Sequence, residues 1–192
     1  MNPEPGPPVA PGTKQLLFYP DLCVGCNLCS YACSMNKFGL VSRSKTAIRI
    51  VQNVGARFEY PDFCVQCDER PCLTHCPTDA LVWNRGLGIV ELVEDKCIHC
   101  GICALECPYE AIAFEDRDVV KCDLCMGEPE CVNFCPTDAI VFREASAEDL
   151  SKRIQVAQEL LPSTKAAFEC TTAKVRDEIK RHPAKRGPQS KR

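Results

Sequence analysis

The sequence predicts an α+β protein made of small modules, and three observations support this. Short apolar runs separated by turns occupy residues 46–142, a pattern typical of short strands joined in hairpins. A cysteine-rich phrase recurs along the same region, which indicates an internal repeat. The last 50 residues instead carry apolar side chains at helical intervals, so we expect a C-terminal helical extension.

The apolar runs predict the strands. Residues 81–83 and 89–92 flank the turn Asn84-Arg85-Gly86 and predict one hairpin. Residues 111–114 and 119–120 flank an acidic turn and predict a second hairpin. Further strands are expected at residues 46–52, 57–60 and 139–142.

Two amphipathic helices are expected within residues 144–181. The first begins after Ser146, a residue type that caps helix N-termini, and Pro162 is expected to end it. Because apolar stripes need burial, the helices should pack on the chain's own core, on a partner subunit or on a second copy. The two stripes are Leu150, Ile154, Ala157 and Leu161, then Phe168, Thr172, Val175 and Ile179.

Composition divides the chain into four segments. Residues 1–13 contain five prolines and predict a flexible arm. Residues 14–143 form the repeat domain, residues 144–181 the two helices, and residues 182–192 a basic tail. Residues 1–142 carry 11 basic and 19 acidic side chains, and this acidic balance argues against a nucleic-acid partner.

The N-terminus has neither the basic nor the apolar region of a signal peptide, and no apolar stretch is long enough to span a bilayer. We therefore expect a cytoplasmic protein with no membrane span of its own. Since the cytoplasm keeps thiols reduced, the 17 cysteines favour metal binding over a disulfide framework.

Sixteen of these cysteines fall into four quartets. Quartets one and three have the spacing C-x2-C-x2-C-x3-C, and the middle gap is longer in quartets two and four. The seventeenth, Cys170, is expected to be a small buried side chain. In chain order the quartets are Cys23, Cys26, Cys29 and Cys33; Cys64, Cys67, Cys72 and Cys76; Cys97, Cys100, Cys103 and Cys107; and Cys122, Cys125, Cys131 and Cys135.

The last cysteine of three quartets opens a common phrase, Cys-Pro-x-Asp/Glu-Ala. It begins at Cys76, Cys107 and Cys135, whereas Cys33 is followed by Ser34. A 4Fe–4S cluster has four irons that each need one outer thiolate, and closely spaced cysteines can wrap three of them. Structural zinc prefers two pairs separated by a longer loop, and neither zinc nor a disulfide scaffold explains the phrase.

The sequence therefore predicts four 4Fe–4S clusters as cofactors. Because the aliphatic core is thin, the cluster-free chain should fold poorly. Tight cysteine loops point N–H groups inward, so donors to sulfur are expected nearby. His75 and His99 lie inside quartets that already supply four thiols, and we do not expect them to be ligands. The expected donors are Val24, Gly25, Val65, Gln66, Ile98 and Gly101.

On these motifs, residues 15–143 resemble the four-cluster ferredoxin-like electron-transfer subunits of complex oxidoreductases. This family includes the iron–sulfur subunits of dimethyl sulfoxide reductase, formate dehydrogenase, hydrogenases and carbon monoxide dehydrogenase. The chain is also similar to the small electron-transfer subunit of tungsten aldehyde ferredoxin oxidoreductase. The resemblance implies two nested bacterial-ferredoxin-like modules, an outer one from quartets one and four and an inner one from quartets two and three.

The resemblance also implies crossed ligand sets, in which three cysteines of one quartet join the last cysteine of another. The implied sets are Cys23, Cys26 and Cys29 with Cys135; Cys122, Cys125 and Cys131 with Cys33; Cys64, Cys67 and Cys72 with Cys107; and Cys97, Cys100 and Cys103 with Cys76.

The implied function is electron transfer within an oxidoreductase complex, with no catalytic residues in this chain. Single electrons would pass between a catalytic subunit, expected to contain tungsten or molybdenum, and another redox subunit or carrier. The short gap at residues 126–130 favours the compact members of the family. Alternatives are a free polyferredoxin shuttle, a ferredoxin subunit linked to hydrogenase or carbon monoxide dehydrogenase, and a maturation factor or sensor. The proline-rich arm and C-terminal helices favour a subunit, because a shuttle needs neither.

Overall fold

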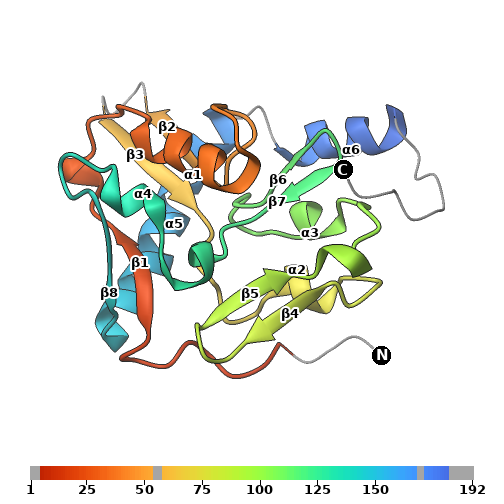
Figure 1. Ribbon diagram of the computed structural model, residues 1–192, viewed down its shortest axis with the longest axis horizontal. Coiled ribbons are helices and arrows are strands. Elements are labelled where there is room, and N and C mark those ends of the chain that lie inside the picture. Colours follow the sequence, from red (N-terminus) through yellow and green to blue (C-terminus); the bar gives the residue numbers. More distant parts are fainter. Residues whose placement is uncertain (1–4, 54–57, 168–170, 182–192) are drawn as a thin grey trace.

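The computed structural model describes residues 5–53, 58–167 and 171–181, and it confirms the α+β class. Four two-stranded antiparallel sheets lie among the described residues, and both predicted hairpins are present with slightly shifted ends (Figure 1). The paired strands are β1 (Lys14–Phe18) with β8 (Ile140–Glu144), β2 (Ile48–Asn53) with β3 (Phe58–Phe63), β4 (Leu81–Asn84) with β5 (Ile89–Leu92), and β6 (Ala113–Glu115) with β7 (Asp118–Val120).

The helices are short within the repeat and long after it. The first has 11 residues, and it ends at Gly39, whose φ of 66° places it in the left-handed region that favours glycine. The helices are α1 (Leu28–Phe38), α2 (Pro71–Thr74), α3 (Ile102–Leu105), α4 (Glu130–Asn133), α5 (Ala147–Ala167) and α6 (Thr171–Arg181).

The first and last strands of the repeat domain pair with each other. Strand β8 was predicted, but its partner β1 was not. Leu16 lies opposite Phe142 in the antiparallel register, and the Tyr19 N–H donates to the Ala139 carbonyl at 2.8 Å just beyond the pair. Figure 1 shows β1 and β8 side by side at one end of the molecule, with α5 behind them. This sheet joins the beginning of the domain to its end.

The helices that carry cysteines pack in two pairs, and one pair is nested inside the other along the sequence. Helix α1, which carries Cys29 and Cys33, packs on α4, which carries Cys131. Helix α2, with Cys72, packs on α3, with Cys103. Quartet one is thereby brought to quartet four, and quartet two to quartet three.

The buried cysteines belong to the apolar core. One apolar cluster combines Leu16, Ile48 and Ile140 with the thiols of Cys29 and Cys131. A second cluster surrounds two other thiols with aliphatic and aromatic side chains. Its members include Leu73, Leu81, Val90, Ile112 and Phe114 with Cys72 and Cys103. Thiols therefore occupy positions that aliphatic side chains fill in most domains of this size.

Residues 5–13 lie against the repeat domain, in contrast to the flexible arm expected for residues 1–13; residues 1–4 fall outside the described part. The Arg70 guanidinium is 1% exposed and donates to the carbonyls of Pro5 at 2.6 Å and Pro7 at 2.9 Å. Its Cζ also lies 3.5 Å from the ring centre of Trp83. Val9 is buried as well, so this segment is held by both polar and apolar contacts.

Helix α5 begins as predicted but does not end at Pro162. The Asp149 N–H donates to Ser146 Oγ at 3.1 Å, and the Ser146 N–H donates to Asp149 Oδ2 at 2.9 Å, so the two residues cap each other. The helix continues to Ala167, so the prediction that Pro162 ends it is wrong. Pro162 itself is exposed, and near it the Tyr60 hydroxyl donates to the Leu160 carbonyl at 3.0 Å. This contact anchors the helix to β3 just before the proline.

Both C-terminal helices pack on the chain's own core where their side chains are described. Ile154 and Ala157 of α5 contact a cluster containing Val65 and Tyr109. Val175 and Ile179 of α6 join the cluster around α3. Of the interpretations left open by the sequence, intramolecular packing is the one observed. The positions of Phe168, Cys170 and the basic tail lie outside the described residues.

One buried polar contact ties α5 to β1 and to the β4–β5 turn. Arg153 Nη1 donates to Gln15 Oε1 at 3.0 Å, and Gln15 Nε2 donates to the Leu87 carbonyl at 3.0 Å. Gln15 is fully buried and Arg153 is 5% exposed. Removing one partner of such a pair leaves a buried group without its acceptor, which costs more than the pair itself contributes.

We expect Gln15→Met to lower the free energy of unfolding by about 2–3 kcal/mol, because the buried Arg153 loses its side-chain acceptor. Anaerobic urea denaturation of the cluster-loaded protein measures this. The double variant Gln15→Met/Arg153→Met should recover part of the loss. Lys152→Met, which alters an exposed neighbour on α5, is the control. A loss below about 0.5 kcal/mol for Gln15→Met would show that the contact contributes little.

Candidate iron–sulfur centres

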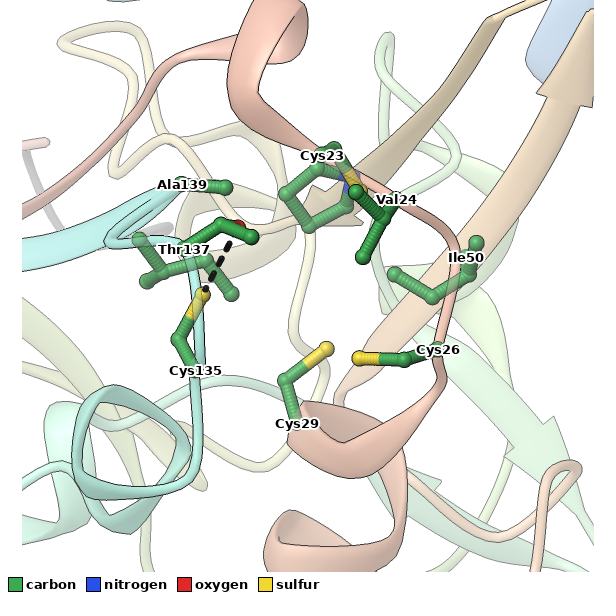
Figure 2. A pocket seen from close by; sticks show the side chains of 10 residues that line it. Cys23, Val24, Cys26, Cys29, Ile50, Cys135, Thr137 and Ala139 are labelled. Atoms are coloured by element: carbon green, nitrogen blue, oxygen red, sulfur yellow. Dashed lines mark hydrogen bonds between the residues drawn. The ribbon is translucent and has the colours of Figure 1, made fainter.

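Three cysteines of quartet one and the last cysteine of quartet four line one cavity. Figure 2 shows Cys23, Cys26 and Cys29 on one side of this space and Cys135 on the other. The remaining lining is almost entirely apolar and includes Val24, Ile50, Pro61, Ala139 and Ile140. The structure thus brings together residues from opposite ends of the repeat domain.

A second cavity has the same plan in the inner part of the repeat. Cys64, Cys67 and Cys72 line it together with Cys107, the last cysteine of quartet three. Its other walls are apolar or aromatic, and they include Val65, Pro71, Pro108, Tyr109 and Ile112.

The other eight cysteines gather in two further groups. Burial and the nearby charges of Cys100, Cys97 and Cys76 raise the pKa of Cys103 to about 12. Burial and the charges of four other thiols likewise raise the pKa of Cys131; in order of effect these are Cys122, Cys33, Cys125 and Cys29. In both groups, three cysteines of one quartet lie near the last cysteine of another, and Cys131 also lies near Cys29.

Each quartet begins with the same strained turn. The second residue after the first cysteine has a left-handed backbone, with φ of 64° at Gly25, 49° at Gln66, 52° at His99 and 55° at Leu124. This conformation turns the N–H of the residue back toward the cysteine. The Gln66 N–H donates to Cys64 Sγ at 3.5 Å and the His99 N–H to Cys97 Sγ at 3.4 Å. Only one of the four is a glycine, so the remaining loops bear strain to reach the sulfur.

Two of the expected N–H donors, Gly25 and Gln66, therefore act on sulfur. The sequence reasoning missed His99 and Leu124, although both occupy the same place in their quartets. Aligning the four quartets at their first cysteine would have identified them.

The repeated Cys-Pro-x-Asp/Glu-Ala phrase surrounds the last sulfur with N–H groups. Its acidic residue has a left-handed backbone in all three copies, with φ of 50° at Asp79, 52° at Glu110 and 54° at Asp138. The next residue is a buried alanine, and the Ala80 N–H donates to Cys76 Sγ at 3.3 Å. Proline begins the turn. The left-handed acidic residue then reverses the direction of the chain, and the small alanine follows it close to the sulfur.

These N–H groups favour the thiolate. Burial acts to raise the pKa of Cys135, but hydrogen bonds from the N–H groups of Thr137, Ile140 and Ala139 together hold it below the ordinary value. The same balance lowers the pKa of Cys76. A hydrogen bond of 3.9 Å also links Cys135 Sγ and Thr137 Oγ1 (Figure 2).

Cys33 departs from the phrase because it lies inside a helix. Helix α1 continues past Cys33 to Phe38, and a proline at position 34 would lack the N–H that the helix needs. Ser34 instead donates from its hydroxyl to the Leu40 carbonyl and accepts from the Ser42 N–H at 2.8 Å. These bonds fasten the chain that leaves the helix.

Most of the enclosed cysteine thiols do not readily lose their proton without a compensating charge. Burial raises the pKa of Cys29, Cys72 and Cys107 to about 12. Thiolates in such sites need compensating positive charge, which iron supplies. Four sulfurs around an apolar space, with N–H groups directed at them, form a donor set that fits a 4Fe–4S cluster. In the described part of the chain, no three His, Cys, Asp or Glu side chains form a site for a single metal ion.

The two histidines within the quartets hydrogen-bond to backbone carbonyls. His75 Nδ1 lies 2.9 Å from the Pro71 carbonyl oxygen, and His99 Nδ1 lies 2.8 Å from that of Arg117. Neither imidazole lines the two cavities described above.

A buried lysine lies between two of the thiol groups. Burial acts to lower the pKa of Lys121, but the charges of Cys64, Cys72 and Cys122 hold it above the ordinary value. Sequence reasoning did not single out Lys121, because Lys96 occupies the same place before Cys97 and the sequence does not show which of the two lysines is buried.

All sixteen quartet cysteines fall within regions that match iron–sulfur family models. Residues 54–145 match the 4Fe–4S dicluster domain, and residues 20–36 match a 4Fe–4S binding domain. Sequence motifs, thiol-lined cavities and family models therefore agree on the class of cofactor.

Two relatives show the family. The polyferredoxin-like subunit of aliphatic sulfonate oxidoreductase from Pyrococcus furiosus is 40% identical over 122 residues, covering 62% of this chain and 70% of the relative. A subunit of polysulfide reductase from Wolinella succinogenes is 34% identical over 146 residues, covering 66% and 73%. One protein of the active site complex of benzoyl coenzyme A reductase with benzoyl-CoA has a TM-score of 0.40 and 22% identity, covering 88% of this chain and 97% of its own length.

The fold and cysteine groups define an iron–sulfur protein of the electron-carrying class. The chain belongs to the family of ferredoxin-like 4Fe–4S electron-transfer proteins that serve as subunits of oxidoreductases. None of its described helices combines the length and apolar character needed to cross a bilayer.

We expect iron removal by anaerobic chelation to lower the melting midpoint by about 10 °C or more. The loss of each of the four expected clusters should lower the free energy of unfolding by at least about 1 kcal/mol. A change of about 1 kcal/mol shifts the midpoint of a chain this size by about 2–4 °C. Far-UV circular dichroism during heating measures the midpoint. Rebuilding with iron and sulfide should restore it, and an unchanged melt after complete iron loss would contradict the prediction.

Proposed function

We propose that the sixteen quartet cysteines hold four 4Fe–4S clusters in the crossed sets given above. The observation that carries this is that each cavity combines three cysteines of one quartet with the last cysteine of another. We propose further that these sets belong to two nested ferredoxin-like modules. The β1–β8 sheet and the α1–α4 packing support the outer module, and the α2–α3 packing supports the inner one.

The proposed role is a relay inside an oxidoreductase complex. Each 4Fe–4S cluster takes up and releases one electron at a time. The chain holds the sulfurs in fixed positions, excludes water with apolar walls and directs N–H groups at the thiolates. Such preorganised surroundings are the means by which a protein sets potentials.

We propose that electrons enter or leave at the group containing Cys26, because this cysteine is exposed. Three large apolar side chains close to it in the sequence are also exposed: Leu22, Val24 and Leu28. An apolar rim around an exposed ligand suits close contact with a partner protein, since contact brings the partner's redox centre near and excludes water.

The proposed partner is a catalytic subunit that contains tungsten or molybdenum, and a second redox subunit or carrier completes the path. The compact gap at residues 126–130 and the likeness to the polysulfide reductase subunit support this class. We place the complex in the cytoplasm, where thiols stay reduced.

A free polyferredoxin shuttle is the second candidate, and one observation removes an argument against it. The proline-rich segment and the C-terminal helices had favoured a subunit, but their described residues pack on the chain itself. They therefore no longer distinguish the two functions. The preference for a subunit rests on the relatives, which are named as parts of larger oxidoreductases.

Anaerobic purification from the native source distinguishes the candidates. We expect about sixteen irons per chain and a larger companion containing stoichiometric tungsten or molybdenum. A protein with the same iron content that elutes alone near its own mass of 21.3 kDa would support the shuttle. Zinc in place of iron would refute both.

The crossed assignment predicts that two distant cysteines serve one cluster. Cys26→Ala and Cys135→Ala should each disturb one cluster, with loss of up to about four irons, and the double variant should lose no more than either alone. Cys125→Ala combined with Cys135→Ala should instead disturb two clusters. Iron analysis and electron paramagnetic resonance measure the outcome, with Cys170→Ala as the control.

If the Cys26 and Cys135 effects add, the two residues serve separate clusters and the crossed assignment fails. The comparison is insensitive to general loss of stability because both double variants remove two thiols.

A further inference from the structure

Lys121 is a buried cation, and the oxygen atoms that accept its hydrogen bonds are neutral. The residue is 6% exposed, and its Nζ donates to the Val90 carbonyl at 2.9 Å, the Cys122 carbonyl at 3.0 Å and Gln66 Oε1 at 3.2 Å. Within the described residues, none of the ion pairs joins Lys121 to a carboxylate. A buried ammonium without a carboxylate is costly unless another negative charge is near.

The contacts of Lys121 join two cysteine loops. Gln66 lies between Cys64 and Cys67 in quartet two, and Cys122 opens quartet four. Gln66 Nε2 also donates to the Cys122 carbonyl at 2.9 Å, so Lys121 and Gln66 close a hydrogen-bonded ring between the loops. On one side of the ammonium is the cavity lined by Cys64, and on the other is the group opened by Cys122.

We propose that Lys121 sets the reduction potentials of the two clusters on either side of it, with its positive charge favouring their reduced states. The inference rests on the cluster assignment proposed above. Each cluster gains one negative charge when it accepts one electron, and a fixed cation nearby stabilises that charge. Burial strengthens the effect because the interior screens charge less than water does. Lys121 thereby makes both clusters easier to reduce than they would be without it.

The chain provides a matched control. Lys96 directly precedes Cys97 as Lys121 directly precedes Cys122, but Lys96 is exposed. Solvent and salt screen an exposed charge, so neutralising Lys96 should alter potentials far less.

The test is Lys121→Met in the full, cluster-loaded chain, compared with Lys96→Met and the unaltered protein. Redox titration followed by electron paramagnetic resonance gives the potentials, and iron analysis verifies the cluster content. We expect two of the four potentials to fall by at least the equivalent of a tenfold change in the reduced-to-oxidised ratio, about 59 mV for one electron. The other two potentials, and all four in Lys96→Met, should change by less than half of this.

Full iron content with four unchanged potentials in Lys121→Met would overturn the inference while leaving the cluster assignment intact. Equal shifts of all four potentials would also overturn it. If Lys121→Met loses iron, Gln66→Glu tests the charge, since it places a carboxylate beside the ammonium and should lower the same two potentials. Iron loss from both variants would assign Lys121 a structural role only. Absence of iron from the unaltered protein would instead refute the proposed function.

Discussion

Cysteine thiols, most of them buried or half-buried, must be held close together around enclosed apolar spaces, and the rest of the structure depends on this constraint. A thiolate in an apolar cavity is unfavourable unless N–H groups and positive charge compensate it. The left-handed turns at Gly25, Gln66, His99 and Leu124 supply N–H groups at the first sulfur of each quartet. The Cys-Pro-x-Asp/Glu-Ala phrase supplies them at the last sulfur of three. Backbone strain is therefore concentrated where the electrostatic need is greatest.

The same constraint explains why the secondary structure is so short. Helices α2, α3 and α4 each have four residues, enough to carry one cysteine inward before the chain must turn to place the next. Such elements cannot build a core among themselves. The longer α5 and α6 supply apolar cover, and Gln15 and Arg153 fix α5 to the first strand.

Local patterns predicted local structure well. The hairpins at β4–β5 and β6–β7 follow from short apolar runs around a turn, and the Ser146 cap follows from residue type. Strand β1 was missed because its partner lies at the far end of the domain and because its Gln15 is polar yet fully buried. The course of α5 through Pro162 was missed because proline disfavours a helix locally, whereas the tertiary packing of Ile154 and Ala157 that supports α5 is invisible in the sequence.

The residues alone predicted the chemistry of the candidate site, but not which cysteines come together in one ligand set. Spacing alone identifies the quartets, and the crossing of ligand sets came from family resemblance, because no local rule says which distant cysteine completes a loop. Lys121 is an example of a site feature that the sequence could not predict. In the sequence it matches Lys96, and only the tertiary structure makes one of them a buried charge.

The pairing of β1 with β8 also orders events during synthesis. A ribosome releases Cys23, Cys26 and Cys29 long before Cys135, so three sides of the outer cavity exist without the fourth while most of the domain is still being translated. The inner cavity, from Cys64 to Cys107, is complete much earlier. The newborn chain therefore carries its first three cysteines without their fourth partner while residues 30–134, more than half of its length, are translated, and a reducing environment protects these thiols from oxidation during that time.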